Sequence, residues 1–411
     1  MKAYRIPAIT VGMLSVFFGF FFFRWCLTDR PTLDFIEYWS AAKLALAGGN
    51  PYSMPEMLAV QKPTGWPGNS YIPFPPEYAH MMRNPPWTIF FILPLGLFDF
   101  LTSRTIFFMV CLGIVAFSTK LLWRTMGGAP KSLWIALLIA FTFPSTCRAI
   151  DTGQISILVF MGLALFFWAA RLEQWFWAGA AASVLLIKPH ALFLFEAALV
   201  LWVLTNRCWR FIWGGLAGLL TATVISLVFV PHAFQHYFYS IQDYPLQSWT
   251  TFTPGTLLRE TFGLDKTWFD YIFSVFGVGW LLWYWRRHKH DWRWEETLPM
   301  LVMASAATAI FSWDADYLIV LPAIFSIAIR FKVLSPESQA QRVKLFILLG
   351  WYFAFILIYY FPAPHEKFYV FNIAAYRWGE CLFATSLWLW YAMMNKSLDK
   401  KGQVSIMQPS L

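Results

Sequence analysis

The chain has 411 residues, of which 59% are hydrophobic and only 13% charged, and its formal net charge is +9. Soluble domains contain about 25% charged residues, so this composition excludes a soluble globular protein of this size. The basic residues alternate with apolar runs instead of gathering on one hydrophilic domain, which argues against nucleic acid as a partner. The cysteines are scattered and show neither a metal-binding spacing nor a disulfide framework. A polytopic helical membrane protein is the class that remains.

The first apolar run, residues 8–27, follows a short basic start as in a signal peptide but lacks a small-residue cleavage site. We therefore predict an uncleaved signal anchor that forms the first transmembrane helix. The later apolar runs lie near residues 101–122, 132–147, 155–170, 175–187, 191–205, 211–230, 269–285, 297–312, 317–330, 344–361 and 380–394. Together the runs predict about twelve transmembrane helices in one integral membrane domain, residues 1–411.

The segment 87–98 is also apolar, but it is too short to cross a bilayer unaided and has Pro94 in its middle. We predict that it is a juxtamembrane or re-entrant helix within a first outer loop, residues 28–100. With the N-terminus inside, the short inner loops then hold most of the Lys and Arg residues, as the positive-inside rule requires. This topology places both termini in the cytoplasm and leaves a second large outer loop at residues 231–268.

The first outer loop begins with "TLDFIEYWSAAKLALAGGNPYS", residues 32–53. Apolar side chains recur there at helical spacing on one face, which predicts an interfacial helix that ends at Gly48. Asp34 is favoured as the N-cap of this helix, with Glu37 three residues later forming a capping box. The same carboxylate could also serve as a catalytic base, because desolvation at the mouth of a membrane cavity raises its pKa.

Two further outer segments carry polar side chains between apolar runs. Arg148 and Gln154 in "TCRAIDTGQIS" belong either to a solvated loop corner or to a functional site. Lys188 and His190 in "LLIKPHALF" belong either to a surface hairpin turn or to a polar cavity. A lysine at membrane depth is costly unless it snorkels, pairs or faces such a cavity, so both interpretations stay open.

The last two segments lie further along the outer face. Gln247 and Arg259 are in "YPLQSWTTFTPGTLLRETFG", and Asp314 and Asp316 are in "FSWDADYLIVLP". Two carboxylates two residues apart are a weak signal for a divalent cation. We predict that no metal is bound.

The order of these motifs resembles glycosyltransferase family 87, whose members have the GT-C fold and include polyprenyl-phosphate-mannose-dependent α-mannosyltransferases. The resemblance rests on an acidic residue after the first span, followed by "YWSAAKLALAGGNPYS", "RNPPW" opening "FFILPLGLF", "TGQIS", "LLIKPH" and "LQSWTTFTPGTLLR". One motif departs, because mannosyltransferase members carry Ser-Trp-x-His-His where this chain has Ala315 and Asp316. A carboxylate does not bind a phosphate directly, so the donor contact differs here or uses another cation.

The resemblance implies an all-α polytopic membrane protein with the GT-C fold and interfacial helices in the first periplasmic loop. It implies transfer of a sugar, with mannose the first choice, from a polyprenyl-phosphate donor to a lipid-linked or glycan acceptor. The reaction would invert the sugar, use no cofactor and take place at the periplasmic face of a bacterial inner membrane. Asp34 is the implied catalytic base. The implied donor-phosphate residues are Lys188, Arg259, Arg148 and His190, and the implied sugar- or acceptor-binding residues are Glu37, Tyr38, Gln154, Gln247 and Asp316.

Three other classes fit the hydrophobic bulk of the chain. A transporter or flippase should show paired repeat halves with broken helices at the midplane, and the sequence shows no such repeat. An O-antigen-polymerase-like protein should carry more arginines in its large outer loop than the single Arg259 of residues 231–268. A structural assembly subunit would not need a carboxylate and several cations on one side of the membrane.

Overall fold

The computed structural model describes residues 32–68, 75–243, 251–263, 266–330 and 385. Every regular element in those ranges is an α-helix or a 3-10 helix, and the same ranges contain no β-strand. The all-α class is therefore confirmed for this part of the chain. The predicted spans 8–27 and 344–361, with nearly all of 380–394, lie outside the described residues, as does Gln247.

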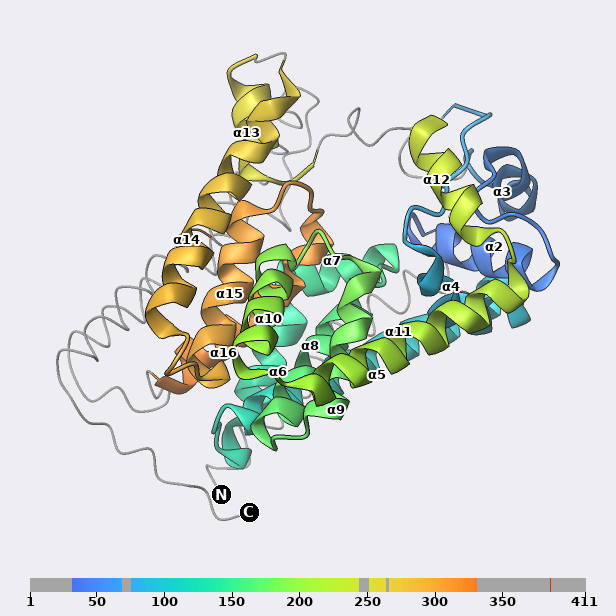
Figure 1. Cartoon of the computed structure of the whole chain (residues 1–411). Helices are drawn as coiled ribbons and strands as arrows, with labels where there is room; N and C mark the ends of the chain where they lie inside the picture. Colours follow the sequence, from blue (N-terminus) through green and yellow to red (C-terminus); the bar gives the residue numbers. More distant parts are fainter. Residues whose placement is uncertain (1–31, 69–74, 244–250, 264–265, 331–384, 386–411) are drawn as a thin grey trace, which may run out of the picture.

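The α-helices labelled in Figure 1 are α2 (Phe35–Leu46), α3 (Met54–Gln61), α4 (Ile89–Ile92), α5 (Phe100–Thr125), α6 (Leu133–Thr142), α7 (Pro144–Thr152), α8 (Ser156–Arg171), α9 (Trp175–Ser183), α10 (Phe193–Asn206), α11 (Trp209–Phe229), α12 (Ala233–Asp243), α13 (Pro254–Thr261), α14 (Ile272–His288), α15 (Trp294–Thr308) and α16 (Leu321–Arg330). The 3-10 helices that matter for the site are η3 (Pro86–Thr88), η4 (Leu93–Leu97), η6 (Val184–Ile187), η8 (Thr267–Tyr271) and η9 (Asp314–Val320).

Among the described residues, two helices, α5 with 26 residues and α11 with 21 residues, are long and apolar enough to cross a membrane by themselves. The bent pair Pro130–Thr142 and Pro144–Thr152 is a third candidate. The other predicted spans within the described ranges also form helices, but these are shorter than the ~20 residues that a crossing needs. The apolar helices give the chain its membrane-protein character, whereas the count of twelve spans stays a prediction.

The predicted span 132–147 is interrupted in the structure. α6 ends at Thr142, α7 begins at Pro144, and the two helices are bent by 59° relative to each other. Proline lacks the amide hydrogen that a continuing helix needs but fits the first turn of a helix, so a new helix begins there. Arg148 is therefore carried by α7, near the end of that helix, and does not lie in the loop corner that was one of the two interpretations of this segment.

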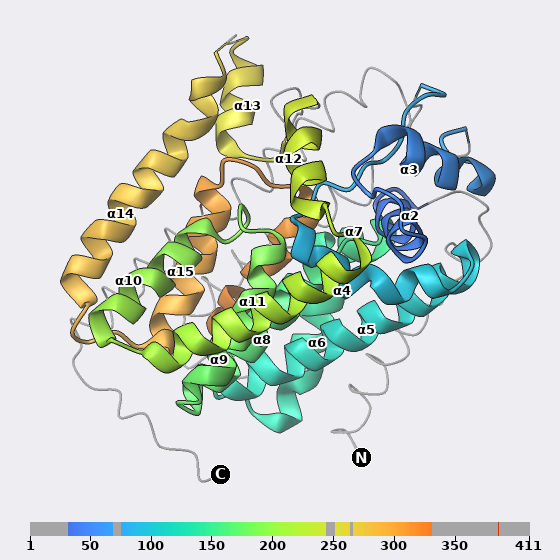
Figure 2. The same cartoon turned by 45° about the vertical axis from the view of Figure 1, so that its right-hand side comes forward.

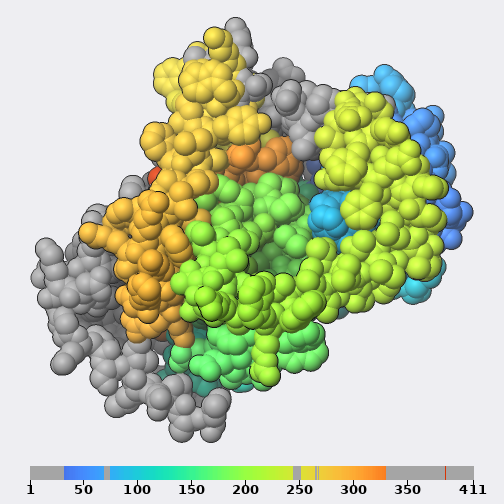
Figure 3. Space-filling model, in the orientation of Figure 1, coloured from blue at the N-terminus to red at the C-terminus, as the bar shows by residue number. Residues whose placement is uncertain are grey.

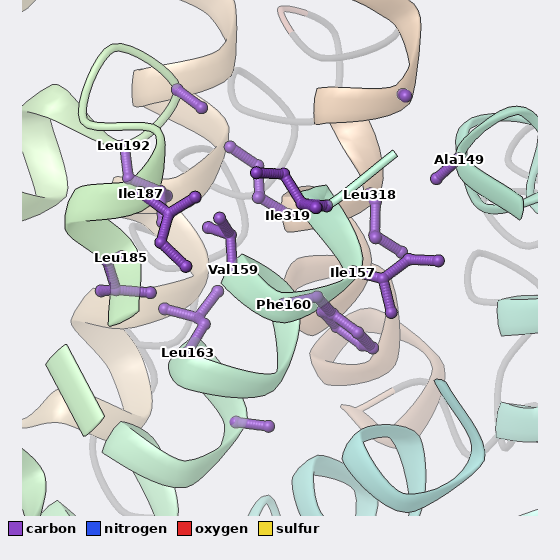
Figure 4. Close-up of a cluster of buried hydrophobic side chains, with 14 of the residues drawn as sticks. Ala149, Ile157, Val159, Phe160, Leu163, Leu185, Ile187, Leu192, Leu318 and Ile319 are labelled. Atoms are coloured by element: carbon purple, nitrogen blue, oxygen red, sulfur yellow. The ribbon is translucent and has the colours of Figure 1, made fainter. Parts of the chain in front are cut away.

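The helix α8 lies at the centre of a cluster of buried apolar side chains (Figure 4). The cluster joins α8 to η6 and η9 through Ile157, Val159, Phe160, Leu163, Leu185, Ile187, Leu318 and Ile319. Because these apolar residues fix both short helices against α8, the polar residues next to them are also fixed. Lys188 directly follows η6, and Asp316 lies in the first turn of η9.

The helix α9 packs closely along α11, with glycines in the contact (Figure 2). A Cβ atom placed on Gly214 would lie 1.8 Å from the carbonyl oxygen of Phe176, whereas one placed on Gly215 would lie 3.6 Å from that of Gly179. The first distance is too short for two non-bonded atoms, and the second is an ordinary van der Waals contact. Gly214 is thus required for the close approach of the helices, and Gly215 is not.

We expect Gly214→Ala to destabilise the protein by about 1–3 kcal/mol, as overpacking does in other interiors, because α9 and α11 must move apart. Gly215→Ala is the matched control and should be neutral or slightly stabilising, since alanine favours a helix over glycine. Thermal unfolding of the detergent-solubilised protein, followed by loss of its gel-filtration peak, measures both variants. Equal melting of the two variants would contradict the packing argument.

The helix α2 is buried on almost every side, and only Lys43 and Leu46 are not buried. It packs against η4 so closely that a Cβ on Gly96 would lie 2.7 Å from the carbonyl carbon of Ala42. The helix is followed, as predicted, by Gly48 with a φ of +73, a conformation that glycine adopts without strain. The amphipathic pattern predicted a helix lying in the membrane interface. In the structure, the apolar face packs into the protein and the acidic face lines a cavity.

Candidate active site

A cavity of about 600 Å³ lies between α2, α7, the connection from η6 to α10, α13 and η9. In the space-filling view, the surface is hollowed between α12 and the first-loop helices on one side and α10 and α13 on the other (Figure 3). The cavity is lined by these residues singled out in the sequence: Asp34, Glu37, Tyr38, Arg148, Gln154, Lys188, His190 and Asp314. The structure thus brings together polar groups from four separate segments of the chain.

His80 lies between the two carboxylates of α2. Its Nε2 atom is 3.4 Å from Oδ1 of Asp34, and its Nδ1 atom is 3.6 Å from Oε2 of Glu37. The other carboxylate oxygen of Glu37 accepts a hydrogen bond of 3.2 Å from the backbone amide of Arg83. The side-chain exposed fractions are 14% for His80, 16% for Asp34 and 6% for Glu37. The three groups form one largely buried electrostatic cluster in the cavity wall.

The imidazole of His80 is held in place from outside the cavity. The buried side chain of Gln61 accepts a hydrogen bond of 2.9 Å from the backbone amide of His80 and donates one of 2.8 Å to its carbonyl oxygen. The imidazole ring also stacks on Trp66, with ring centroids 5.8 Å apart and 16° between the ring planes. Both contacts leave the two ring nitrogens directed at the carboxylates.

Burial acts on all three groups, and their mutual charges change the pKa of each group to a different extent. For Asp34, burial raises the pKa, but the hydrogen bond and charge of His80 outweigh it, and the pKa is lowered from 3.8. For Glu37, burial is the largest effect and raises the pKa to about 7. For His80, burial lowers the pKa, but both carboxylates oppose it, and the pKa is raised from 6.5. The raised pKa expected for Asp34 is therefore wrong, and Glu37 has the raised value instead.

Asp34 occupies the N-cap position of α2, but its side chain does not cap the helix. Its backbone amide donates a hydrogen bond of 3.0 Å to the carbonyl oxygen of Thr152, which connects the start of α2 to the end of α7. Glu37 does not complete a capping box, because Arg83 and His80 engage its carboxylate. The capping interpretation of these two acids is wrong, and both line the cavity.

Lys188 lies in the cavity wall with an exposed fraction of only 3%. Its Nζ atom donates to Oε1 of Gln154 at 2.6 Å, to Oγ of Ser156 at 3.0 Å and to Oδ1 of Asp316 at 2.8 Å. An ammonium group has three N–H donors, so all of them are used within the protein. The same Gln154 oxygen accepts a hydrogen bond of 3.0 Å from the Tyr38 hydroxyl. This network excludes the surface hairpin turn considered for Lys188.

Asp316 lies behind Lys188 and does not line the cavity. Its Oδ1 atom accepts hydrogen bonds from Ser156 and Lys188, and its Oδ2 atom accepts one of 3.0 Å from the backbone amide of Trp313. Its side-chain exposed fraction is 1%. Asp316 is therefore the counter-ion of Lys188, and the sugar contact predicted for it would require these groups to move.

The side chains of Arg148 and His190 are more accessible than that of Lys188. Nε of Arg148 lies 3.0 Å from Oδ2 of Asp314, and Nε2 of His190 lies 3.8 Å from Oδ2 of Asp316. Their side-chain exposed fractions are 26% and 31%, against 4% for Lys188. A ligand in the cavity can therefore contact the side chains of Arg148 and His190 more readily than that of Lys188. Asp314 therefore pairs with Arg148, whereas Asp316 pairs with Lys188.

The outer segment that contains Gln247 and Arg259 contributes less to the cavity wall than its motif predicted. Arg259 does not line the cavity. Its Nε atom donates a hydrogen bond of 3.1 Å to Oδ1 of Asp270, and Asp270 does line the cavity. Gln247 lies outside the described residues, so its predicted contact stays a prediction. Direct contact between Arg259 and a phosphate also stays a prediction, and it would require the pair with Asp270 to open.

The sequence motifs predicted no functional role for three polar residues just before the Pro-Pro pair, namely His80, Arg83 and Asn84. Nη1 of Arg83 donates to the Ser240 carbonyl at 3.3 Å, and Nδ2 of Asn84 donates to the Ile187 carbonyl at 3.2 Å. The signal that could have found them is the concentration of hydrogen-bonding side chains just before the Pro-Pro pair, in the same outer loop that carries Asp34 and Glu37.

Within the described ranges, no group of three or more His, Cys, Asp or Glu side chains is arranged to hold a metal ion. A reaction without a metal therefore stays a prediction for the whole chain.

An all-helical membrane protein with a polar cavity between acidic and basic side chains is the class that the fold and the site define. The family model of glycosyltransferase family 87 matches residues 83–328, which is more than half of the chain. The chain belongs to glycosyltransferase family 87 and is a membrane glycosyltransferase, which confirms the resemblance found in the sequence. The matched residues include Arg148, Lys188 and Asp316 but begin after Asp34 and Glu37. A comparison with curated proteins gives no match.

Proposed function

We propose that this glycosyltransferase moves a sugar from a polyprenyl-phosphate donor to a lipid-linked or glycan acceptor at the periplasmic face of a bacterial inner membrane. The observation that carries the proposal is the arrangement of Asp34, Arg148 and His190 around one cavity of about 600 Å³. Small-molecule sites typically have volumes of about 300–1,000 Å³, so a sugar phosphate fits this cavity. The acidic group can accept the proton of the acceptor hydroxyl, and the basic groups can stabilise the negative charge of the leaving phosphate.

Asp34 acts as the general base in this proposal. It is the more exposed carboxylate of α2, and its lowered pKa keeps it ionised at neutral pH. It removes the proton of an acceptor hydroxyl while the hydroxyl oxygen bonds to the anomeric carbon. The bond from that carbon to the phosphate oxygen breaks, and its electron pair leaves with the phosphate. The proton ends on Asp34, and this direct displacement inverts the configuration of the sugar.

The leaving polyprenyl phosphate is a stable anion, so it needs positive charge rather than a general acid. Arg148 is an accessible cation of the cavity wall, His190 places a ring nitrogen nearby, and charge-assisted contacts are strong where water is excluded. The fully engaged Lys188 holds the Gln154 amide in place beside the Tyr38 hydroxyl. These two polar groups are the proposed contacts of the sugar hydroxyls.

Mannose is the proposed sugar. Other hexoses on the same carrier are the alternatives, because this chain has Ala315 and Asp316 where mannosyltransferase members of the family carry two histidines. Membership in glycosyltransferase family 87 favours transfer over the transporter, polymerase and structural-subunit alternatives.

The test is transfer of radiolabelled sugar by the purified protein in lipid nanodiscs, with a bacterial membrane-lipid extract as acceptor. Polyprenyl-phosphate mannose, polyprenyl-phosphate glucose and GDP-mannose are compared as donors. We expect transfer from at least one polyprenyl-phosphate sugar and none from the nucleotide sugar. Transfer from GDP-mannose alone, or from none of the three, would overturn the proposed donor class.

A further inference from the structure

The cluster around His80 makes the two carboxylates of α2 chemically different. We propose that His80 is a positioning residue that keeps Asp34 charged as the base and leaves a proton on Glu37, so that the Glu37 carboxyl group donates a hydrogen bond to an oxygen of the sugar donor. This inference deepens the proposed function and rests on it. It assigns to Glu37 a neutral, hydrogen-bond-donating role.

The first argument is the charge of the cluster. A protonated imidazole carries one positive charge, and the His80 nitrogens lie 3.4 Å from Asp34 and 3.6 Å from Glu37. With both carboxylates ionised, the cluster would keep a net negative charge in a largely buried site beside an anionic phosphate. A buried charge without compensation is costly, and a carboxylate in that position takes up a proton instead. One proton on one carboxyl group makes the cluster neutral.

The second argument identifies the carboxyl group that holds the proton. Glu37 has a side-chain exposed fraction of 6% against 16% for Asp34, so Glu37 loses more hydration. Asp34 also has the shorter contact with His80. The pKa values agree with this division, since burial raises the pKa of Glu37 to about 7 while His80 offsets the burial of Asp34. Two carboxyl groups with pKa values driven apart in this way commonly divide the acid and base roles.

The other titratable groups near the cluster come from every element around it. They are Tyr38 on α2, Tyr78 and Arg83 in the loop of His80, Lys188 after η6, and Asp314 and Asp316 in η9. Lys188 and Asp316 form a mutual ion pair, and Asp314 pairs with Arg148. Arg83 reaches Glu37 through its backbone amide. His80 is the basic side chain with an ion-pair contact to both Asp34 and Glu37.

The protonation of Glu37 matters because of what the donor carries. A carboxylate can only accept hydrogen bonds, and it repels a phosphate, whereas a neutral carboxyl group can donate one hydrogen bond to a phosphate or hydroxyl oxygen. With a pKa of about 7, Glu37 keeps its proton at pH 6 and loses it as the pH rises to 8. We therefore expect wild-type turnover to fall as the pH rises through about 7.

Glu37→Gln tests the donor role directly. The glutamine amide has nearly the same shape and still donates hydrogen bonds, but it does not titrate. We expect the kcat of this variant at pH 6 to stay within about tenfold of wild type, and its fall above pH 7 to disappear. Loss of turnover at every pH would overturn the inference, because Glu37 would then be required as an ionised base.

His80→Gln tests the positioning role. Without the imidazole charge, the pKa values of both carboxyl groups rise, so the pH of maximum kcat should move upward by about one unit or more, with KM changed little. A uniform loss of kcat without a shift of the pH profile would assign His80 a merely structural role and overturn the inference. His236→Gln is the matched control, since His236 does not line the cavity, and its profile should be that of wild type.

An infrared measurement without substrate separates this inference from the proposed function. Difference spectra of the purified protein between pH 6 and pH 8 detect the carbonyl stretch of protonated carboxyl groups. The band of wild type at pH 6 should lose one component in Glu37→Gln, and that component should persist to higher pH in His80→Gln. Identical spectra of wild type and Glu37→Gln would overturn the inference even where transfer is observed. The expected band in a protein that transfers no polyprenyl-phosphate sugar would support the proton assignment and overturn only the donor class.

Discussion

Replacing Asp34 by asparagine is expected to lower the kcat of sugar transfer by about 10²- to 10⁴-fold, which is the usual contribution of a positioned general base. The asparagine amide matches the carboxylate in shape but cannot take up the acceptor proton at neutral pH. The backbone amide of residue 34 keeps its hydrogen bond to Thr152, so α2 stays attached to α7. The melting temperature should therefore remain near that of wild type, and the loss should appear in kcat rather than in folding.

Asp291→Asn is the matched control for this experiment. Asp291 follows α14, its side-chain exposed fraction is 72%, and it does not line the cavity. The same change of carboxylate to amide there should leave kcat unchanged. Full turnover by Asp34→Asn would remove Asp34 from the role of base, while the family membership of the chain would stand.

Breaking the Lys188–Asp316 pair is expected to have the largest effect on stability. Both side chains are buried and 2.8 Å apart, so Lys188→Met removes the ammonium that bonds Asp316 and leaves the His190 ring, at 3.8 Å, as its remaining basic neighbour. Removing one partner of a buried pair typically costs about 3–5 kcal/mol. We expect a strongly lowered melting temperature for Lys188→Met in detergent, and a similar loss for Asp316→Leu, which leaves the ammonium unpaired.

The double variant Lys188→Met with Asp316→Leu separates charge from packing. Replacing a whole buried pair by apolar side chains is often neutral, so the double variant should recover a large part of the melting temperature that either single variant loses. Arg293→Met is the surface control, because the Arg293–Glu296 pair is exposed by 60% and 39%, and such pairs contribute about 0–1 kcal/mol. Additive losses in the double variant would show that packing, and not the ion pair, holds η9 at this place.

The sequence predicted the class of the protein well because membrane helices are encoded locally. A run of apolar residues predicts a helix whatever it packs against, and the helices at 101–122 and 211–230 appear in the structure as α5 and α11. Pro144 shows the limit of that argument, since the apolar run 132–147 continues across a residue at which the helix must restart. The composition predicted one apolar helix, whereas the missing backbone amide hydrogen of Pro144 divides it into two helices.

The candidate site was predictable to the extent that its residues lie in recognisable motifs. Asp34, Gln154 and Lys188 were singled out in three distant segments, and all three line the cavity. His80 was missed because its importance depends on lying between Asp34 and Glu37, more than forty residues earlier in the chain. A capping box was expected for the two acids because local spacing was the only geometry that the sequence offered.

The sequence by itself determined a multi-helix membrane protein, its family and the side chains that could carry charge chemistry. The tertiary structure alone decided which charges meet: Lys188 with Asp316, Arg148 with Asp314, and His80 with both carboxylates of α2. The physical reason is that hydrophobic periodicity and turn chemistry act over a few residues, whereas the pKa of a buried group is set by its nearest neighbours in space. Those neighbours are placed by the packing of η6 and η9 against α8, and by the buried position of α2 beside α7.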